Sequence, residues 1–106
     1  MFVGVLRLTF HVPHARSLKD KRRVVQKFRD RVRARFDVSI AEVGAQDKLQ
    51  RAVFGVSVVS SDAGVCDSVL EHVAREAETA ADAVLTHRET ETLTVGDELY
   101  GDDDGR

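Results

Sequence analysis

The sequence predicts an α+β sandwich in which a four-stranded antiparallel sheet carries two helices on one face. Three observations favour this class. Hydrophobic patterns with the period of a strand or a helix follow one another in the order β-α-β-β-α-β along the 106 residues. The first and third strand patterns are the most apolar, which is typical of central strands. The second is shorter and the fourth more polar, which suits the edges of a sheet.

One domain, over residues 1–95, is expected from a chain of this length, because 42% hydrophobic residues are enough for a single core. Residues 96–106, GDELYGDDDGR, predict a frayed, flexible acidic tail. No apolar run approaches the roughly 20 residues of a membrane span, and the N-terminus lacks the features of a signal peptide. The single cysteine, Cys66, excludes an internal disulfide, so the composition favours the cytoplasm.

The first strand is predicted over residues 2–12, where apolar and mixed side chains alternate until Pro13 ends the pattern. A helix is then predicted over residues 17–35. On a helical wheel its apolar residues form one stripe: Leu18, Val24, Val25, Phe28, Val32 and Phe36. Ser17 is a suitable N-cap, and Asp20 stands three residues later, as in a capping box with Asp in place of Glu.

The same helix is strongly basic. Residues 16–35 hold ten of the sixteen Lys and Arg residues and two acids, a formal charge of +8 in a chain whose total is −2. Lys21 falls inside the apolar stripe, so we expect its stem to be covered and its ammonium group to reach outward. A solvated charged face is the ordinary interpretation of such a helix. The one-signed excess instead favours a polyanionic partner, and phosphate backbones are the commonest polyanions in a cell.

The remaining elements are predicted as strands over residues 37–43, 49–60 and 83–93, with a polar turn over 44–48. Residues 60–62 supply N-cap candidates for a second helix that ends near Ala80. The predicted inward residues of this helix are Val65, Val69, Val73 and Ala77, with Cys66 and Leu70 beside them. This order is that of the ferredoxin-like βαββαβ sandwich, whose first and third strands are central.

The sheet face away from the helices is predicted to be unusually apolar. Its residues come from the first and third strands: Val3, Val5, Arg7, Thr9, His11, Val53, Gly55, Ser57 and Val59. A sheet face fully exposed to water would carry fewer apolar side chains. We therefore expect a partner, a second copy of the chain or the acidic tail to cover it.

Motifs for catalysis, metal binding or nucleotide binding are not recognisable. The four histidines show no ligand spacing such as HxxxH, and Cys66 is expected to be a small buried hydrophobic residue. The glycines form no phosphate-binding loop. Asp47 stands in the polar turn, where an Asp that caps the turn is commoner than an acid or base. We expect no enzymatic activity, no metal and no cofactor.

Two stretches resemble a known family. HVPHARSLKDKRRVVQKFRDRVRARFDVSIAEVG (residues 11–44) and QDKLQRAVFGVSVVS (residues 46–60) are similar to the YlxP-like family of small bacterial proteins, a domain of unknown function. The resemblance covers about residues 2–93. It implies a ferredoxin-like fold. It also implies, by association only, a role in RNA or ribosome biology, because the family's genes often lie among those for translation initiation and ribosome maturation.

RNA binding in ribosome assembly or translation is the function that these observations favour, with RNA or a ribosomal subunit as the partner and the basic helix on the phosphates. The candidate RNA-binding residues are Arg16, Lys19, Arg22, Arg23, Lys27, Arg33, Gln46, Asp47, Gln50 and Arg51. Base-stacking aromatic residues are missing, since the third strand offers only Phe54, on its helix side. The alternative is a homodimeric protein-interaction module that does not bind RNA. A third possibility is a small-molecule or catalytic domain built on the loop at residues 46–51.

Overall fold

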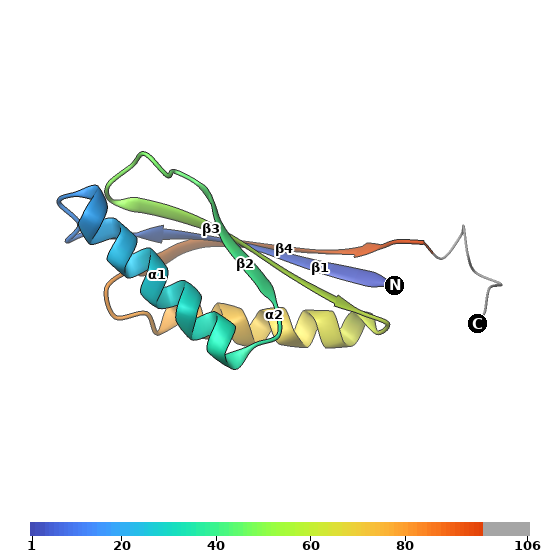
Figure 1. Cartoon of the computed structure of the whole chain (residues 1–106). Coiled ribbons are helices and arrows are strands. Elements are labelled where there is room, and N and C mark those ends of the chain that lie inside the picture. Colours follow the sequence, from blue (N-terminus) through green and yellow to red (C-terminus); the bar gives the residue numbers. More distant parts are fainter. Residues whose placement is uncertain (97–106) are drawn as a thin grey trace.

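The computed structural model describes residues 1–96, which form a four-stranded sheet with two helices on one face (Figure 1). Along the chain the elements are β1 (Phe2–His11), α1 (Leu18–Arg35), β2 (Ser39–Gly44), β3 (Arg51–Ser60), α2 (Ala63–Glu78) and β4 (Val84–Thr94). The predicted ferredoxin-like βαββαβ class is therefore confirmed. The predicted acidic tail lies outside the described residues from position 97 onward.

β1 is paired along its length on both sides. The strand order is β2-β3-β1-β4, and all neighbouring strands are antiparallel. Leu8 of β1, for example, lies opposite Phe54 of β3 and Arg88 of β4. The two most apolar strands are thus central, as predicted. The strand bounds differ from the prediction by one or two residues, because β2 begins at Ser39 and β3 at Arg51.

The core lies between the helices and the inner face of the sheet. Leu6, Leu8 and Phe10, which alternate along β1, are almost inaccessible to solvent. Phe10 makes edge-to-face contacts with Phe28 of α1 and Phe54 of β3, at ring-centroid distances of 5.1 Å and 5.8 Å. Each such contact contributes about 0.5–1.5 kcal/mol beyond the burial of the rings. This aromatic cluster fixes the middle of α1 against the two central strands.

The start of α1 has the predicted cap. The Ser17 hydroxyl accepts a hydrogen bond from the backbone N–H of Asp20 at 3.1 Å. The Asp20 carboxylate in turn accepts from the backbone N–H of Arg16, also at 3.1 Å. In a standard capping box the returning bond would come from the N-cap residue itself. Here it comes from the residue before, so the cap also ties down the end of the β1–α1 loop.

The inward face of α2 differs from the prediction at its first position. The buried residues are Cys66, Leu70, Val73, Ala74 and Ala77, whereas Val65 is 46% exposed. The helix lies so close to β1 that a Cβ atom on Gly4 would be 2.8 Å from Leu70 Cδ1 and 3.1 Å from Cys66 Cβ. A side chain on residue 4 would collide with Leu70 and Cys66, so this position of β1 suits only glycine. Cys66 lies inward at this crossing, whereas Val65 lies at the surface.

The outer face of the sheet has no element packed on it within residues 1–96 (Figure 1). Val5, Val59 and Leu93 are exposed on it by 37%, 61% and 41%. Val53, which we predicted to be open on this face, is only 7% exposed. The irregular end of β2 explains this difference, because the pairing of β2 shifts before Gly44 and brings that residue opposite Val53. The apolar part of the face is therefore narrower than predicted.

Candidate nucleic-acid interface

The Lys and Arg side chains of residues 16–35 divide into paired and unpaired groups. Three of the paired side chains point toward α2 and the loop after it. Lys27 lies 3.4 Å from the Asp82 carboxylate, and Arg31 and Arg35 lie 3.3 Å and 2.8 Å from that of Glu76. These ion pairs join α1 to the second half of the fold. Of this group, Lys27 was predicted as a phosphate contact, and its charge is partly neutralised by Asp82.

A group of four cations without an acidic partner lies on the outer side of α1 and on the loop before it. We call it the basic face, and it consists of Arg16, Lys19, Arg22 and Arg23. All four side chains are exposed, and no acid within residues 1–96 forms an ion pair with any of them. All four belong to the predicted RNA-binding set. Their charge is available to an external anion.

Two further arginines lie on the flank of α1 that faces β2. Arg33, a predicted phosphate contact, donates from Nη2 to the Ile40 carbonyl oxygen at 3.3 Å, so part of its hydrogen-bonding capacity is used within the fold. Arg29 was not among the predicted residues. Its Nε atom is buried and has no hydrogen-bond partner among the described residues. The signal that could have found Arg29 is its position on the helical wheel, next to Arg22 and Arg33.

Lys21 corrects the prediction that its ammonium group reaches outward. The residue is 2% exposed, and Nζ donates to the carbonyl oxygen of Ala45. Nζ also lies 3.1 Å from Oε2 of Glu42, whose side chain is 19% exposed. The cause is the β2–β3 turn, in which Ala45 has a left-handed φ of 58° and which closes over the first turns of α1. Lys21, a cation on the apolar side of α1, thus links the helix to this turn.

A polar pocket lies where α1 meets the end of β2. It has a volume of about 220 Å³ and is lined by Leu18, Lys21, Arg22, Val25, Glu42 and Gln46. We call it the Glu42 pocket. Oε2 of Glu42 is buried in the ion pair with Lys21, but the geometry of this contact is not that of a hydrogen bond. Within residues 1–96, no hydrogen bond reaches either oxygen of the Glu42 carboxylate, so it retains unused acceptor capacity.

The predicted residues of the β2–β3 loop do not form one patch. Gln46 lines the Glu42 pocket, beside the basic face. Asp47 and Arg51 instead line a different hollow on the outer side of the sheet, together with Arg7. Gln50 has a structural role, because its amide donates to the carbonyl oxygens of the β1–α1 loop, at 3.2 Å to Pro13 and 3.3 Å to Ala15. Of the four residues, the structure therefore brings only Gln46 to the basic face.

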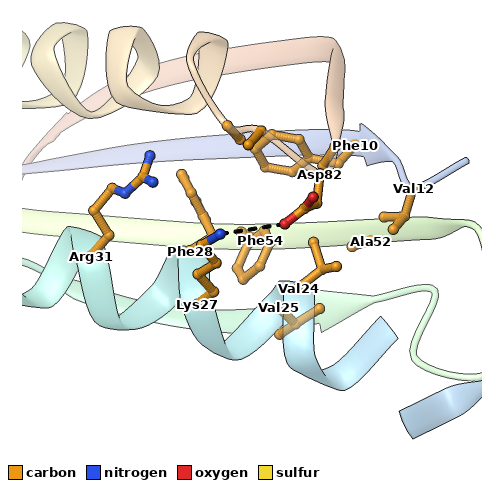
Figure 2. A pocket seen from close by; sticks show the side chains of 13 residues that line it. Phe10, Val12, Val24, Val25, Lys27, Phe28, Arg31, Ala52, Phe54 and Asp82 are labelled. Atoms are coloured by element: carbon orange, nitrogen blue, oxygen red, sulfur yellow. Dashed lines mark hydrogen bonds and ion pairs between the residues drawn. The ribbon is translucent and has the colours of Figure 1, made fainter. Parts of the chain in front are cut away.

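Figure 2 shows an apolar hollow between α1 and the connection from α2 to β4. Phe10, Phe28 and Phe54 are among its lining residues, and the ion pair of Lys27 with Asp82 crosses it. Its free space is about 20 Å³, which is room for about one water molecule. This hollow is a gap in the packing of the core and is too small for a ligand.

Three further observations concern metal ligands, the cysteine and the hydrophobicity of the helices in the described part of the chain. No three His, Cys, Asp or Glu side chains of residues 1–96 lie together as a metal would require. Cys66 is fully buried, with Sγ 3.8 Å from the carbonyl oxygens of Phe2 and Val58, which agrees with its predicted role as a small core residue. Neither of the two helices combines the length and the hydrophobicity needed to cross a bilayer.

Comparisons with known proteins agree with the resemblance noted in the sequence. A family model described as "Protein of unknown function (DUF503)" matches residues 3–90. The "Uncharacterized protein YlxP" of Bacillus subtilis (strain 168) is 44% identical over 59 residues, which are 56% of this chain and 64% of that protein. The match thus spans less than two thirds of the relative's length.

Solved structures resemble the fold at low sequence identity. The "De novo designed protein Foldit4" has a TM-score of 0.51 and 14% identity, over 89% of this chain and 98% of the designed one. A C-terminal segment of the alpha subunit of aIF2 from Pyrococcus abyssi has a TM-score of 0.47 and 18% identity, over 86% of this chain and 49% of that one. The likeness to the designed protein concerns the fold alone.

Proposed function

The chain belongs to the DUF503 family of proteins of unknown function, and we propose that it is an RNA-binding accessory protein of ribosome assembly or translation. In this proposal the protein binds and does not catalyse. The basic face makes the contacts with phosphates. The ribosomal setting comes only from the association of genes that the resemblance implies, whereas the RNA chemistry is argued from the residues of this chain.

The observation that carries the proposal is the separation of paired from unpaired cations on one helix. Where α1 meets α2, its bases have acidic partners, namely Glu76 and Asp82. On the basic face none of the four side chains has such a partner within residues 1–96. Like charges gathered without counter-charges repel one another, and this cost is recovered when phosphates are bound.

Recognition in this proposal is mainly of the RNA backbone and shape. Modules that read single-stranded bases on a sheet do so with exposed aromatic residues. Here Phe10, Phe28 and Phe54 are buried on the helix side, and the outer sheet face carries no Phe, Tyr or Trp within the described part of the chain. A structured RNA bound weakly, with little preference for sequence, is therefore the ligand that fits the surface.

The test of this proposal is the salt dependence of RNA binding. Affinity for a labelled RNA hairpin should be measured by fluorescence anisotropy between 50 and 200 mM salt. Each neutralised phosphate contributes about −0.7 to −0.9 to the slope of log K against log salt, so four cations predict a slope of about −3. An affinity that does not change with salt would contradict the proposed mechanism.

A homodimer is the second candidate, and the exposed apolar row on the outer sheet face favours it. Val3 of β1 pairs with Val59 of β3 on one side and Leu93 of β4 on the other, so these side chains form one row across the sheet. The same face carries the ion pair of Arg7 with Glu89, 3.2 Å apart. A face with an apolar row and both charge signs can be complementary to a second copy of itself.

Val59→Lys is the variant that tests the dimer, because Val59 is 61% exposed and its replacement should not disturb the core. If the outer faces pack together, a buried lysine without a partner should release monomers, as measured by light scattering after size-exclusion chromatography. Val65→Lys is the matched control, since Val65 is also exposed but lies on α2. Wild-type protein that is monomeric at high concentration would rule out this interface.

A further inference from the structure

We propose that the Glu42 pocket receives one unstacked base of a bound RNA and prefers bases with an exocyclic amine, namely adenine, cytosine and guanine, over uracil. This inference rests on the proposed RNA-binding function and adds a determinant of specificity to it. The pocket adjoins the basic face through a shared residue, Arg22, which is exposed on the helix and lines the pocket. A phosphate bound to Arg22 would therefore bring its own base, or the next one, to the mouth of the pocket.

The size of the pocket suits a single base. Its volume of about 220 Å³ is far larger than the 20 Å³ of the apolar hollow, which has room for about one water molecule. Pockets for drug-sized ligands are larger, at about 300–1,000 Å³. The walls include Leu18, which is 40% exposed, and Val25. Leu18 offers apolar contact area to the flat face of a base, whereas Val25 is only 6% exposed.

The carboxylate of Glu42 sets the preference. Oε2 is held 3.1 Å from the Lys21 ammonium group, and Oε1 accepts no hydrogen bond from residues 1–96. An acceptor that folding has partly removed from water is costly to leave unpaired. The ligand that satisfies it best is an N–H donor, and carboxylates accept from the amino group of cytosine in protein–nucleic acid complexes.

Uracil is disfavoured by the same chemistry. Its only donor on the Watson–Crick edge is N3–H, which lies between two carbonyl oxygens, and these would face the negative carboxylate. Adenine, cytosine and guanine each present an amino group at the end or the side of this edge, where it can approach Glu42 alone. Gln46 lines the same pocket and can donate to the neighbouring acceptor of such a base.

Oligocytidine and oligouridine of equal length are the probes that test this inference, because they carry the same phosphates and differ at the group that should meet Glu42. Fluorescence anisotropy with the full chain should show about tenfold tighter binding of the cytidine oligomer. Both oligomers should show the same salt slope. Glu42→Gln should reduce the difference between the two affinities to about twofold or less, because an amide can both donate and accept.

The controls separate a loss of folding from a loss of recognition. Glu78→Gln makes the same chemical change at an exposed residue of α2 and should leave the tenfold difference intact. Leu18→Ala removes a wall of the pocket without touching the ion pair of Lys21 with Glu42, and should lower the difference about threefold. It therefore tests the pocket even if Glu42→Gln fails to fold.

Three results would overturn the inference, and they differ in what else they imply. Equal, salt-dependent affinities of the wild-type protein for the two oligomers would remove the base pocket and leave the proposed RNA binding in place. If the protein binds neither oligomer and does not bind the hairpin, both the base pocket and the proposed RNA binding are ruled out. A cytidine preference that survives both Glu42→Gln and Leu18→Ala would show that the preference arises elsewhere on the surface.

Discussion

Replacing Arg22 and Arg23 together by glutamate is expected to lower the affinity for an RNA hairpin about 10- to 100-fold at 50 mM salt. Both side chains are exposed on the basic face, and neither has an acidic partner within residues 1–96. The double substitution removes two phosphate contacts and places two negative charges where the RNA backbone should lie. The same measurement should show a salt slope that is shallower by at least about 1.5, at about 0.7–0.9 for each lost contact.

Arg75→Glu with Arg88→Glu is the control for this prediction. It changes the net charge by the same amount at two exposed arginines outside the basic face, both of which lie near Glu71. Long-range electrostatics alone would reduce the affinities of both double variants alike. The proposed interface instead predicts that the control keeps its affinity within about threefold at 150 mM salt, where fields are screened beyond about 8 Å. Equal losses in the two variants would show that the basic face is not the site of contact.

Lys21→Met is expected to lower the free energy of unfolding by about 3 kcal/mol. Methionine keeps much of the volume of the buried stem but leaves the Glu42 carboxylate without its counter-ion, and it removes one of the two donors to the Ala45 carbonyl oxygen, the other being the backbone N–H of Lys48. Removing one partner of a buried pair typically costs about 3–5 kcal/mol. We expect the lower end of this range, because Glu42 keeps 19% of its side chain exposed and can be partly solvated. Urea unfolding followed by circular dichroism measures the change.

Two further variants make this prediction specific. Lys27→Met on the same helix breaks an exposed ion pair with Asp82 and should cost about 1 kcal/mol or less. The double replacement of Lys21 by Met and Glu42 by Leu removes both charges of the buried pair, and it should recover most of the stability lost in Lys21→Met. A loss for Lys21→Met no larger than that for Lys27→Met would mean that the buried pair contributes little to the fold.

The order and faces of the elements could be predicted because they depend on local periodicity. The alternation in residues 2–12 and the apolar stripe of α1 each place side chains inward or outward without knowledge of the rest of the chain. The cap at Ser17 is equally local, since its partners lie within three residues. Predictions failed where a distant segment decides the environment. Lys21 is buried because the turn at Ala45 closes over it. A helical wheel of α1 gives no information about the position of that turn.

The same distinction applies to the candidate site. The wheel identified the basic side of α1, but the partners of Lys27 and Arg31 are Asp82 and Glu76, which are 45 to 55 residues away. Which cations are neutralised could therefore be known only once the helices were placed. The polar loop was expected to act as one patch, yet Gln46 and Asp47 line different hollows although they are neighbours in the chain. Adjacent residues of a tight turn can face opposite sides of a sheet.

The pairing of the first strand with the last has a consequence for how a nascent chain folds. Phe2 lies opposite Thr94, and His11 opposite Val84, so the central strand obtains its second neighbour from the final element. Until residues 84–94 have been translated, one edge of this apolar strand has unpaired N–H and C=O groups, a surface that favours aggregation. Such non-local pairing also slows folding, since a long loop must close first. The sheet is therefore completed after translation of its last strand, and not progressively from the N-terminus.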